Sequence, residues 1–376
     1  MRIESFGSLC SGVGTQEMAI KKIYPGIELK FYSEIDKYAI KSFEAIHGPI
    51  ENLGDFTKVL NPQYVDFLFA STPCQDFSLA GKQKGFEGFR GSLTGELIEY
   101  LKRMEVLPKV VGFENVTGLL QEKFQEGYYI FKQEFRNLGY KVNEFILNAK
   151  DYGIPQNRDR VFLLCTLDNV VIRNPKKIKG PVLKCLLENE VDEKFYMSEK
   201  MFLCLNDKTS RNGFIRAERF KYYFSHEREE AYCVTTYAGQ RASDNFIKVK
   251  EATKKGYSEA YPGDSINLEQ PKSETRRGRV GKGVAQTLTT GCNQATLDNN
   301  YRIRKLTPLE CWRLMGISDQ NFNKAASVNS NSQLYKQAGN GIVVDVLVAL
   351  FTELKNSYIE EQPFEVVGNT IAYTLF

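Results

Sequence analysis

The chain has 376 residues, and its 50 lysine and arginine residues against 46 acidic ones give a formal net charge of only +4. This length allows two domains, and so mild a charge neither proves nor excludes a nucleic-acid partner. No window of about 18 uninterrupted apolar residues appears, and the N-terminus MRIESFGSLC lacks the apolar core of a signal peptide, so we expect a cytoplasmic protein without membrane contact.

Cysteine and histidine usage restricts the available chemistry. The eight cysteines never form a CxxC pair, which predicts free thiols, argues against a zinc ribbon and leads us to expect no metal. The two histidines, His47 and His226, lie in sequence surroundings that favour surface positions. If the chain is an enzyme, its acid and base are therefore expected to be carboxyl groups and its nucleophile a cysteine.

The first 170 residues alternate apolar, β-rich runs with helix-like stretches. Strands are predicted at residues 3–9, 29–35, 65–70, 110–114, 144–149 and 160–166. A helix is predicted over residues 127–138, where Phe131, Phe135 and Leu138 share one face and Gly139 is a C-cap. Strands that alternate with helices predict an α/β fold with a doubly wound, mostly parallel sheet.

The first two strands are followed by residues that suggest a nucleoside pocket. Gly12 and Gly14, in SLCSGVGTQEMA, would let the backbone approach a ligand at the start of a helix. Glu34 ends the second strand, where an acid of a dinucleotide-type fold binds ribose hydroxyls. An acid beside an aromatic, Asp55 with Phe56, follows at the next turn. The alternative is a plain tight turn with surface acids, since the third glycine of a pyrophosphate loop is missing.

A cysteine stands at the end of the third predicted strand, in STPCQDFS. A free cysteine is often a buried structural residue, but the polar neighbours of Cys74 and its strand-end position favour a reactive thiolate. Glu114, beside Asn115, ends the next strand, and adjacent strand ends would bring this carboxyl group close to the thiol. Such a pair is suited to covalent catalysis.

Two arginines precede the last of these strands, in IPQNRDRVF. If the strand begins there, alternation would aim Arg158 and Arg160 to the same side. The pair could then hold a phosphate or a carbonyl oxygen in bidentate fashion. A solvated basic edge is the alternative.

The regular alternation stops near Asn174. From there to about residue 300 no period is sustained, and residues 173–282 contain 23 basic against 16 acidic side chains, a balance that suits a polyanionic partner. Helical patterns return at residues 307–317 and 341–354, and the second is apolar on nearly every side. We expect a catalytic and cofactor-binding domain at residues 1–173, a smaller irregular domain at 174–318, and a C-terminal segment at 319–376 that completes the first domain.

In this order, the motifs resemble those of the cytosine carbon-5 DNA methyltransferases. They are SLCSGVG, SEID, GDF, STPCQDFS, FENV, QNRDR, KLTPLECWRLMGI and QAGNGIVVDVL. The resemblance implies a Rossmann-like S-adenosylmethionine-dependent methyltransferase fold and makes the middle region a target-recognition domain. Three positions depart from the family pattern: Cys10 replaces an aromatic, Thr15 a glycine and Gly341 a common serine.

The resemblance also implies the reaction, in which S-adenosylmethionine is converted to S-adenosylhomocysteine and carbon 5 of a cytosine is methylated. Cys74 would add to carbon 6, Glu114 would protonate or hydrogen-bond nitrogen 3, and Asn115 would hold the base or the loop. Arg160 would contact the pyrimidine carbonyl, and Arg158 a phosphate or the loop. The implied cofactor-binding residues are Leu9, Cys10, Ser11, Gly12, Val13, Gly14, Glu34, Ile35, Asp55, Phe56, Thr72, Pro73, Asn340, Gly341 and Ile342.

The implied partner is double-stranded DNA, from which the target base must be flipped out at a cost of a few kcal/mol. Family likeness further implies a monomer, encoded by a prokaryote or a phage, and leaves open a cognate restriction endonuclease that acts on the same site. The expected DNA contacts are Gln75, Ser78, Arg90, Gln156, Thr236, Tyr237, Gln240, Arg241, Arg276, Arg277, Arg279 and Lys282.

Two further readings stay open beside the DNA methyltransferase. An RNA-modifying relative would keep the same core, although the Cys-Phe-Thr signature of the transfer-RNA branch is absent. A catalytically silent DNA-binding relative is disfavoured, because a binding protein has no need of Cys74, Glu114 and the paired arginines. A nicotinamide-dependent oxidoreductase fails because GxGxxG is missing.

Overall fold

The computed structural model describes residues 2–73, 92–197, 247–270, 273, 275–298, 302–360, 366–367 and 370–371. The chain divides into two compact units. The first unit comprises Met1–Leu147, Asp159–Lys177 and Ile342–Phe376, and the second comprises Asn148–Arg158 and Ile178–Gly341. The chain therefore passes between the units at four points.

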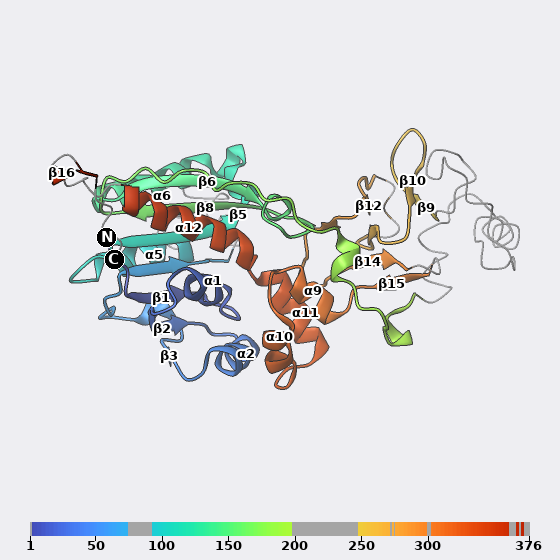
Figure 1. Ribbon diagram of the computed structural model, residues 1–376, viewed down its shortest axis with the longest axis horizontal. Helices are drawn as coiled ribbons and strands as arrows, with labels where there is room; N and C mark the ends of the chain where they lie inside the picture. Colours follow the sequence, from blue (N-terminus) through green and yellow to red (C-terminus); the bar gives the residue numbers. More distant parts are fainter. Residues whose placement is uncertain are drawn as a thin grey trace, which may run out of the picture. The chain divides into compact units, whose positions relative to one another are not determined.

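A seven-stranded sheet in the order β3-β2-β1-β4-β5-β8-β6 forms the centre of the first unit (Figure 1). Neighbours from β3 to β5 are parallel, whereas β8 is antiparallel to β5. The predicted doubly wound, mostly parallel sheet is thus confirmed. The strands are β1 (Ser5–Leu9), β2 (Glu28–Ser33), β3 (Glu51–Asn52), β4 (Phe67–Ala70), β5 (Val110–Val116), β6 (Lys141–Asn148) and β8 (Asp159–Thr166).

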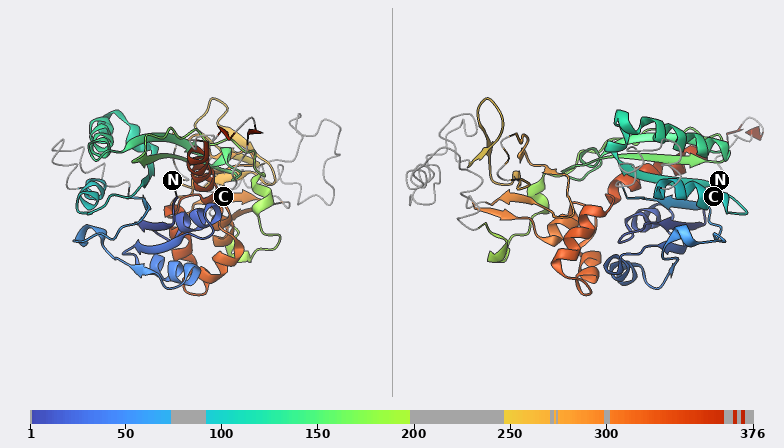
Figure 2. Two further views of the ribbon diagram at one scale, coloured as in Figure 1. Left: turned by 60° about the vertical axis from the view of Figure 1, so that its left-hand side comes forward. Right: turned by 180° about the vertical axis from the view of Figure 1, so that it is seen from behind.

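Helices cover both faces of this sheet, and the central strand β4 shows how its sequence divides between them. Phe67 and Phe69 meet Phe351 of α12, with ring centroids 5.2 and 5.7 Å apart. Leu68 belongs instead to the core cluster on the opposite face, with side chains from α5 and α6. Seen from behind, α6 lies in front of the sheet (Figure 2). The helices are α1 (Thr15–Ile23), α2 (Lys37–His47), α5 (Leu93–Lys102), α6 (Gln125–Asn137) and α12 (Val344–Glu360).

The start of β1 is held to β4 by one buried carboxylate. Asp66, which directly precedes β4, accepts the backbone N–H groups of Glu4 and Ser5 at Oδ2, at 2.8 and 3.1 Å. In return the hydroxyl of Ser5 accepts the N–H of Asp66 at 2.9 Å. These reciprocal bonds fix the register of the two strands before the ladder begins, and therefore the positions of their carboxyl ends.

One helical stretch, Asn331–Tyr358, is long and apolar enough to cross a membrane by length and composition alone. However, 56% of its most apolar window is buried inside the protein. Its larger part, α12, packs against α1 and carries Phe351 onto the sheet. The apolar sequence of α12 is accounted for by this burial.

In its described residues, the second unit contains short strands and the three α-helices α9 to α11. Its four-stranded antiparallel sheet has the order β12-β11-β14-β15, while β9 pairs with β10 and β7 pairs in parallel with β13. The strands are β7 (Gln156–Asn157), β9 (Ile247–Lys250), β10 (Tyr257–Ala260), β11 (Ser265–Asn267), β12 (Val280–Gly281), β13 (Ala285–Gln286), β14 (Gln294–Leu297) and β15 (Ile303–Lys305). The helices are α9 (Pro308–Arg313), α10 (Asp319–Ala326) and α11 (Asn331–Asn340).

The expected boundaries at residues 173 and 318 differ from this division. Helices α10 and α11 pack with α9, because the indole of Trp312 donates to the carbonyl of Leu334 at 2.9 Å and meets the ring of Phe322 at 5.6 Å. Residues 319–341 therefore belong to the second unit, and the C-terminal return to the first unit begins at Ile342. The catalytic and recognition roles of the two units stay predictions.

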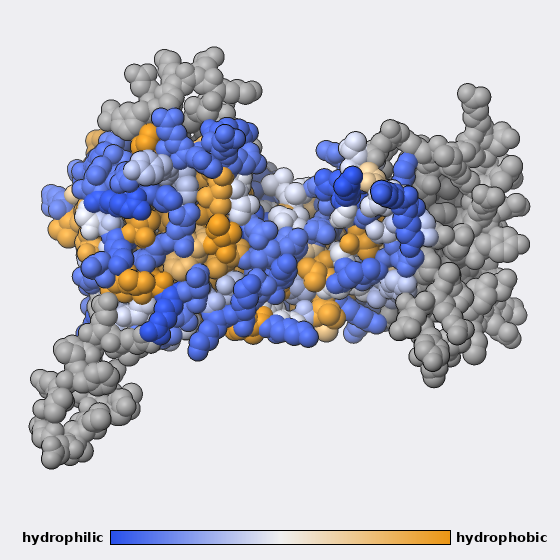
Figure 3. Space-filling view, turned by 90° about the horizontal axis from the view of Figure 1, so that it is seen from above, coloured by the Kyte–Doolittle hydropathy of each residue, from blue (hydrophilic) through white to orange (hydrophobic). Residues whose placement is uncertain are grey.

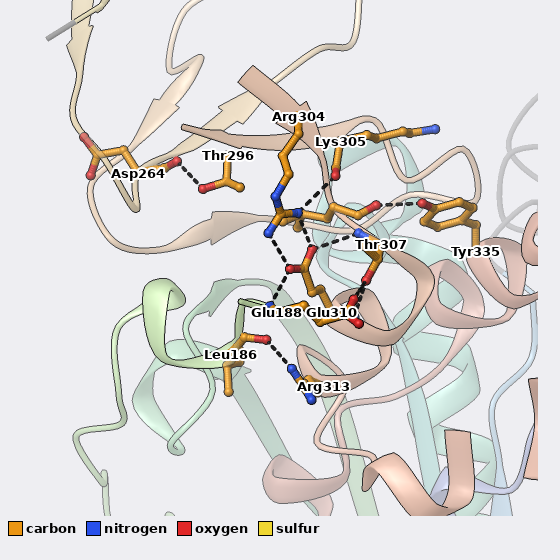
Figure 4. Close-up of polar contacts among 11 residues, drawn as sticks. Leu186, Glu188, Asp264, Thr296, Arg304, Lys305, Thr307, Glu310, Arg313 and Tyr335 are labelled. Carbon is orange, nitrogen blue, oxygen red and sulfur yellow. Dashed lines mark hydrogen bonds and ion pairs between the residues drawn. The ribbon is translucent and has the colours of Figure 1, made fainter. Parts of the chain in front are cut away.

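A buried ion pair joins β15 to α9 in the second unit (Figure 4). Arg304, 3% exposed, donates to both carboxylate oxygens of the fully buried Glu310, at 2.8 and 2.6 Å. The same carboxylate accepts the backbone N–H groups of Thr307 and Glu188, each at 2.8 Å. Four donors thus fill its four lone-pair sites, as burial of a charge requires. Thr307 and Glu310 also form the capping box of α9.

We predict that Glu310→Ala destabilises the protein by about 3–5 kcal/mol, because it leaves the Arg304 guanidinium buried without its counter-charge. The double variant Arg304→Met, Glu310→Leu should be much less destabilised. The chain's single tryptophan, Trp312, lies in α9, so urea unfolding followed by its fluorescence measures this region.

The matched control is Asp319→Asn, which removes an exposed ion pair with Arg313. It should cost about 1 kcal/mol or less. A Glu310→Ala variant as stable as this control would contradict the prediction.

Candidate active site

Four neighbouring parallel strands of the first unit end side by side. Leu9 at the end of β1 pairs with Ser33 of β2 and with Ala70 of β4, and Ala70 pairs with Phe113 of β5. The segments that follow these strands carry most of the residues selected from the sequence. The structure therefore brings together the glycine loop, Glu34, Thr72 with Pro73, and Glu114 with Asn115 at one edge of the sheet.

The glycine loop after β1 turns tightly, and a side chain at its second glycine would be strained. Gly14 has a φ of +81°, and a Cβ placed there would lie 2.2 Å from Nε2 of His47. His47 was expected at the surface, but it is half-buried with its ring 4.6 Å from that of Phe43. The histidine at the end of α2 therefore packs beneath the loop. Cys10 also has a positive φ of 55°, a left-handed conformation that is uncommon outside glycine.

Glu34 connects the glycine loop to the end of β2. Its Oε2 accepts the N–H of Gly12 at 2.8 Å, and its Oε1 accepts the N–H groups of Ile35 and Asp36, each at 2.8 Å. A carboxylate has about four lone-pair sites, so three protein donors leave capacity for a hydroxyl. The neighbouring side chain of Ile35 is 76% exposed. This loop can thus offer one acceptor and an apolar surface to a ligand.

The Asp55–Phe56 turn differs in detail from the expectation. Asp55 accepts the N–H and hydroxyl of Thr57 at 3.1 and 2.7 Å, and its hydrogen bonds from Thr57 and Lys58 lower the pKa of this carboxyl group. Phe56 is only 2% exposed and meets the ring of Tyr100 at 6.1 Å, so its ring belongs to the core. What the turn can offer to a ligand is the carboxylate of Asp55 and backbone groups.

A buried polar chain runs from α1 to the glycine loop and was not predicted from the sequence. The hydroxyl of Ser8 donates to Glu17, and the hydroxyls of Ser8 and Ser11 lie 2.6 Å apart. The backbone of Ser11 also forms hydrogen bonds in the loop. Its N–H donates to the carbonyl of Ser33 at 3.0 Å, and its carbonyl accepts the N–H of Gly14. Burial raises the pKa of Glu17 to about 7. The sequence did offer one signal for this polar chain, an acidic residue in the first turn of the helix that follows a buried strand.

At the end of β5, Glu114 and Asn115 point to different partners. Glu114, 8% exposed, pairs with Nε of Arg160 on β8 at 3.0 Å. The amide of Asn115 donates to the carbonyl of Thr72 at 3.0 Å, and the hydroxyls of Thr72 and Thr94 lie 3.0 Å apart. Asn115 therefore holds the backbone two residues before Cys74. Cys74 itself, with Gln75, Ser78 and Arg90, lies outside the described residues.

Gln156 was expected at DNA and Arg158 at a phosphate or the loop, and both side chains are buried on backbone carbonyl groups. Arg158, 3% exposed, donates to the carbonyl groups of Leu288 at 2.9 Å, Gly339 at 2.9 Å and Gly341 at 2.8 Å. Gln156 is fully buried and donates to the carbonyl of Leu314 at 2.7 Å. Strand β8 begins only at residue 159, so the two arginines do not act as a parallel pair. Both Gln156 and Arg158 join segments within the second unit.

The candidate DNA contacts in the second unit also separate into buried and exposed side chains. Arg279 is 2% exposed and donates to the carbonyls of Gln270 and Glu269 at 2.8 and 3.2 Å, so it supports the fold and does not face solvent. Arg277 and Lys282 are exposed, and Arg276 is half-buried. The described part of this unit's surface seen in Figure 3 is mostly hydrophilic, with apolar patches between. The remaining expected contacts, Thr236, Tyr237, Gln240 and Arg241, fall outside the described residues.

The last expected cofactor residues follow α11. Asn340 ends this helix and Gly341 caps it. A Cβ on the preceding Gly339, within α11, would lie 2.5 Å from the backbone of Thr289, so the close approach of the helix to Thr289 requires this glycine. Ile342 is 3% exposed and begins the return to the first unit. Among the residues that the structure describes, no group of three or more His, Cys, Asp or Glu gathers as a metal site.

Comparison with known proteins shows that residues 5–356 match the family model for the C-5 cytosine-specific DNA methylase. The orphan methyltransferase M.SPRI of Bacillus phage SPR is 30% identical, over 94% of this chain and 98% of that protein. The type II methyltransferase M.HhaI of Haemophilus parahaemolyticus is 28% identical, over 91% of each. A solved structure of a putative prophage-encoded DNA modification methyltransferase (E. coli) has a TM-score of 0.60 at 18% identity, over 95% of this chain and 99% of that one.

We predict that Glu17→Gln stabilises the protein at pH 8 and not at pH 4.5. The pKa of Glu17 is about 7 in the folded protein, against 4.5 for an unperturbed glutamate. Between pH 4.5 and 7 the unfolded chain releases this proton and the folded protein keeps it, so wild-type stability falls as pH rises through this range. The expected gain above pH 7 is roughly 3 kcal/mol. Urea unfolding of both proteins from pH 4.5 to 8, followed by circular dichroism, measures it.

The control for this series is Glu96→Gln, which changes a first-turn acid of α5 that is not fully buried. It should give no gain that grows with pH. Parallel stability curves for wild type and Glu17→Gln across the range would refute the assignment.

Proposed function

Because the chain belongs to the C-5 cytosine-specific DNA methylases, we propose that it methylates a cytosine flipped out of a short, specific sequence of double-stranded DNA, with S-adenosylmethionine as methyl donor. Cytosine methylation of DNA is the activity of this family, and the chain is a DNA cytosine methyltransferase. The proposal adds the cofactor, the covalent route and the sequence specificity. The observation that carries it is that the Gly12–Glu34 contact and the Glu114–Arg160 pair lie at the same edge of the sheet. The neighbouring strands β2, β1, β4 and β5 end at this edge.

The residues of the first unit fit a nucleoside that bears ribose hydroxyls and a positive sulfonium group. Glu34 keeps capacity for a hydroxyl hydrogen bond, and Asp55 offers an acceptor at the next turn. The loop of Gly12 to Gly14 precedes α1 and permits close approach of a ligand to the backbone. When bound, S-adenosylmethionine supplies an electrophilic methyl group. We assign its binding in the first unit to these residues together with Ile35, Thr72, Pro73 and Ile342.

The chain's own groups activate the base. Carbon 5 of cytosine is a weak nucleophile, and addition of the Cys74 thiolate to carbon 6 makes the ring an enamine with electron density at carbon 5. The Glu114 carboxyl group protonates or hydrogen-bonds nitrogen 3, which stabilises the charge that develops. Arg160, at 3.0 Å from Glu114, orients that carboxyl group and can reach the pyrimidine carbonyl. After methylation, loss of the proton on carbon 5 to a base expels Cys74 as thiolate.

Asn115 supports this step through the backbone. Its amide holds the carbonyl of Thr72, and the Thr72 hydroxyl is in turn paired with Thr94. This contact fixes the strand end from which residue 74 continues. We therefore assign Asn115 to the positioning of the nucleophile.

Double-stranded DNA is the proposed substrate, with exposed basic residues of the second unit such as Arg277 and Lys282 at the phosphates. Relatives from Bacillus phages are named orphan methyltransferases, which favours an enzyme that works without a cognate endonuclease. We propose a monomer in the cytoplasm, where its DNA substrate is found. RNA is the alternative substrate, disfavoured by the absence of Cys-Phe-Thr.

Methyl transfer from labelled S-adenosylmethionine to mixed-sequence duplex DNA and to RNA tests the proposal. Label in DNA, mapped by bisulfite sequencing to one short recurrent sequence, is the expected result. Label in RNA alone would replace DNA as the substrate. Duplex binding without any label would instead indicate a silent relative.

We predict that Cys74→Ser lowers methyl transfer below detection but leaves duplex binding intact, because serine lacks a thiolate. With duplexes that contain 5-fluorocytosine, which blocks the final proton loss, the wild type should form a covalent adduct and the variant none. Denaturing gel electrophoresis detects this adduct.

The matched control is Cys185→Ser, which changes an exposed cysteine of the second unit. This variant should turn over normally and form the adduct. Normal turnover by Cys74→Ser would remove Cys74 from the mechanism.

A further inference from the structure

The side chain of Asn52 connects the two acidic loops assigned to the cofactor. Strand β3 is only two residues long, and its ladder with β2 ends where Tyr32 pairs with Asn52 and the N–H of Leu53 reaches the carbonyl of Tyr32 at 2.8 Å. Beyond this point β2 has no strand beside it on that side. The backbone groups of Glu34, which lies just past β2, therefore need partners from a side chain.

The amide of Asn52 supplies both partners. Its Oδ1 accepts the N–H of Glu34 at 3.1 Å, and its Nδ2 donates to the carbonyl of Glu34 at 3.1 Å. The same Oδ1 accepts the N–H of Gly54 at 2.9 Å, one residue before Asp55. A side-chain amide carries one acceptor and donors, as a peptide group does, so Asn52 extends the sheet by one step where the main chain turns away.

We propose that Asn52 is a positioning residue for the nucleoside half of the cofactor, an inference that rests on the proposed function. It fixes Glu34 and Gly54 at once and so sets the separation of the two acids, Glu34 and Asp55. The hydroxyl of Ser33 reinforces the arrangement by donating to the carbonyl of Gly54 at 2.6 Å. Asn52 acts through the Glu34 carboxylate and not by contact with the ligand.

The Glu34 carboxylate explains why this position matters for affinity. Its Oε1 is filled by two backbone donors and its Oε2 by the N–H of Gly12, which leaves one direction from which a ribose hydroxyl can donate. The three donors prevent the carboxylate from turning freely. The position of the Glu34 backbone therefore decides where this open direction points. Loss of the Asn52 amide releases this backbone and costs affinity through preorganisation.

The same sheet provides a matched control at its opposite edge. Asn143 of β6 also makes three such bonds, from Nδ2 to the carbonyls of Leu164 and Val170, each at 3.3 Å, and from the N–H of Ile172 to Oδ1 at 3.2 Å. These partners belong to β8 and the segment after it, away from the strand ends that carry Glu34. Asn143→Ala should thus reproduce the structural loss without the effect on the cofactor.

Calorimetric titration with S-adenosylhomocysteine, and with its analogue that lacks the ribose 2′-hydroxyl, tests the proposal on wild type, Asn52→Ala and Asn143→Ala. Asn52→Ala should bind S-adenosylhomocysteine about tenfold more weakly, as expected for loss of one to two hydrogen bonds' worth of preorganisation. With the deoxy analogue, the affinity of Asn52→Ala should be lower than that of wild type by about twofold or less, because this ligand has no 2′-hydroxyl to bond to Glu34. Asn143→Ala should bind both ligands as the wild type does.

If Asn52→Ala does not fold, Asn52→Asp takes its place. Aspartate keeps the acceptor for the N–H groups of Glu34 and Gly54, but it places a charged oxygen against the Glu34 carbonyl where Nδ2 donated. This repulsion also releases the Glu34 backbone, so the same ligand-dependent deficit is expected. Wild-type affinity in the Asn52 variant overturns the proposal, as does an equal loss for both ligands or an equal loss in Asn143→Ala. Failure of the wild type to bind S-adenosylhomocysteine would instead refute the proposed cofactor.

Discussion

The parallel register of β2, β1, β4 and β5 is the constraint on which the candidate site depends. Parallel strands end at one edge of a sheet, so loops that are far apart in the sequence meet there. A shift of β4 by one residue would exchange Leu68 and Phe69 between the two buried faces, which makes such a slip costly. The Asp66 bonds to the start of β1 secure the same register from the other end. Core packing thus positions Glu34 and Glu114.

The sequence predicted the parts of the fold that depend on local pattern. The buried strands read as apolar runs, and the helix around Phe131 and Phe135 showed its helical face, so the α/β sheet could be predicted. His47, Glu17 and Asn52 could not be selected in this way. Their importance comes from partners distant in the chain, such as Gly14, Ser8 and Glu34, and no periodicity encodes a side chain's tertiary partner. The expected boundaries at residues 173 and 318 differ from the observed units for the same reason, because contacts between distant parts of the chain define those units.

The arginines show a second limit of sequence reasoning. Arg158 and Arg279 were selected because a guanidinium group suits phosphate, yet both are buried on backbone carbonyls. A fork of five donors serves an internal turn as well as an anion, and local sequence does not distinguish the two uses. Arg160, only two residues from Arg158, instead meets a carboxylate of the first unit.

The four crossings between the units bear on any exchange of the second unit between related enzymes. A graft of residues 178–341 alone would leave behind the segment 148–158, which belongs to the same compact unit. Arg158 would then face a foreign turn in place of the carbonyls of Leu288, Gly339 and Gly341, and Gln156 would lose the carbonyl of Leu314. The transplantable module is thus discontinuous in sequence, and a functional chimera must carry both pieces from one parent.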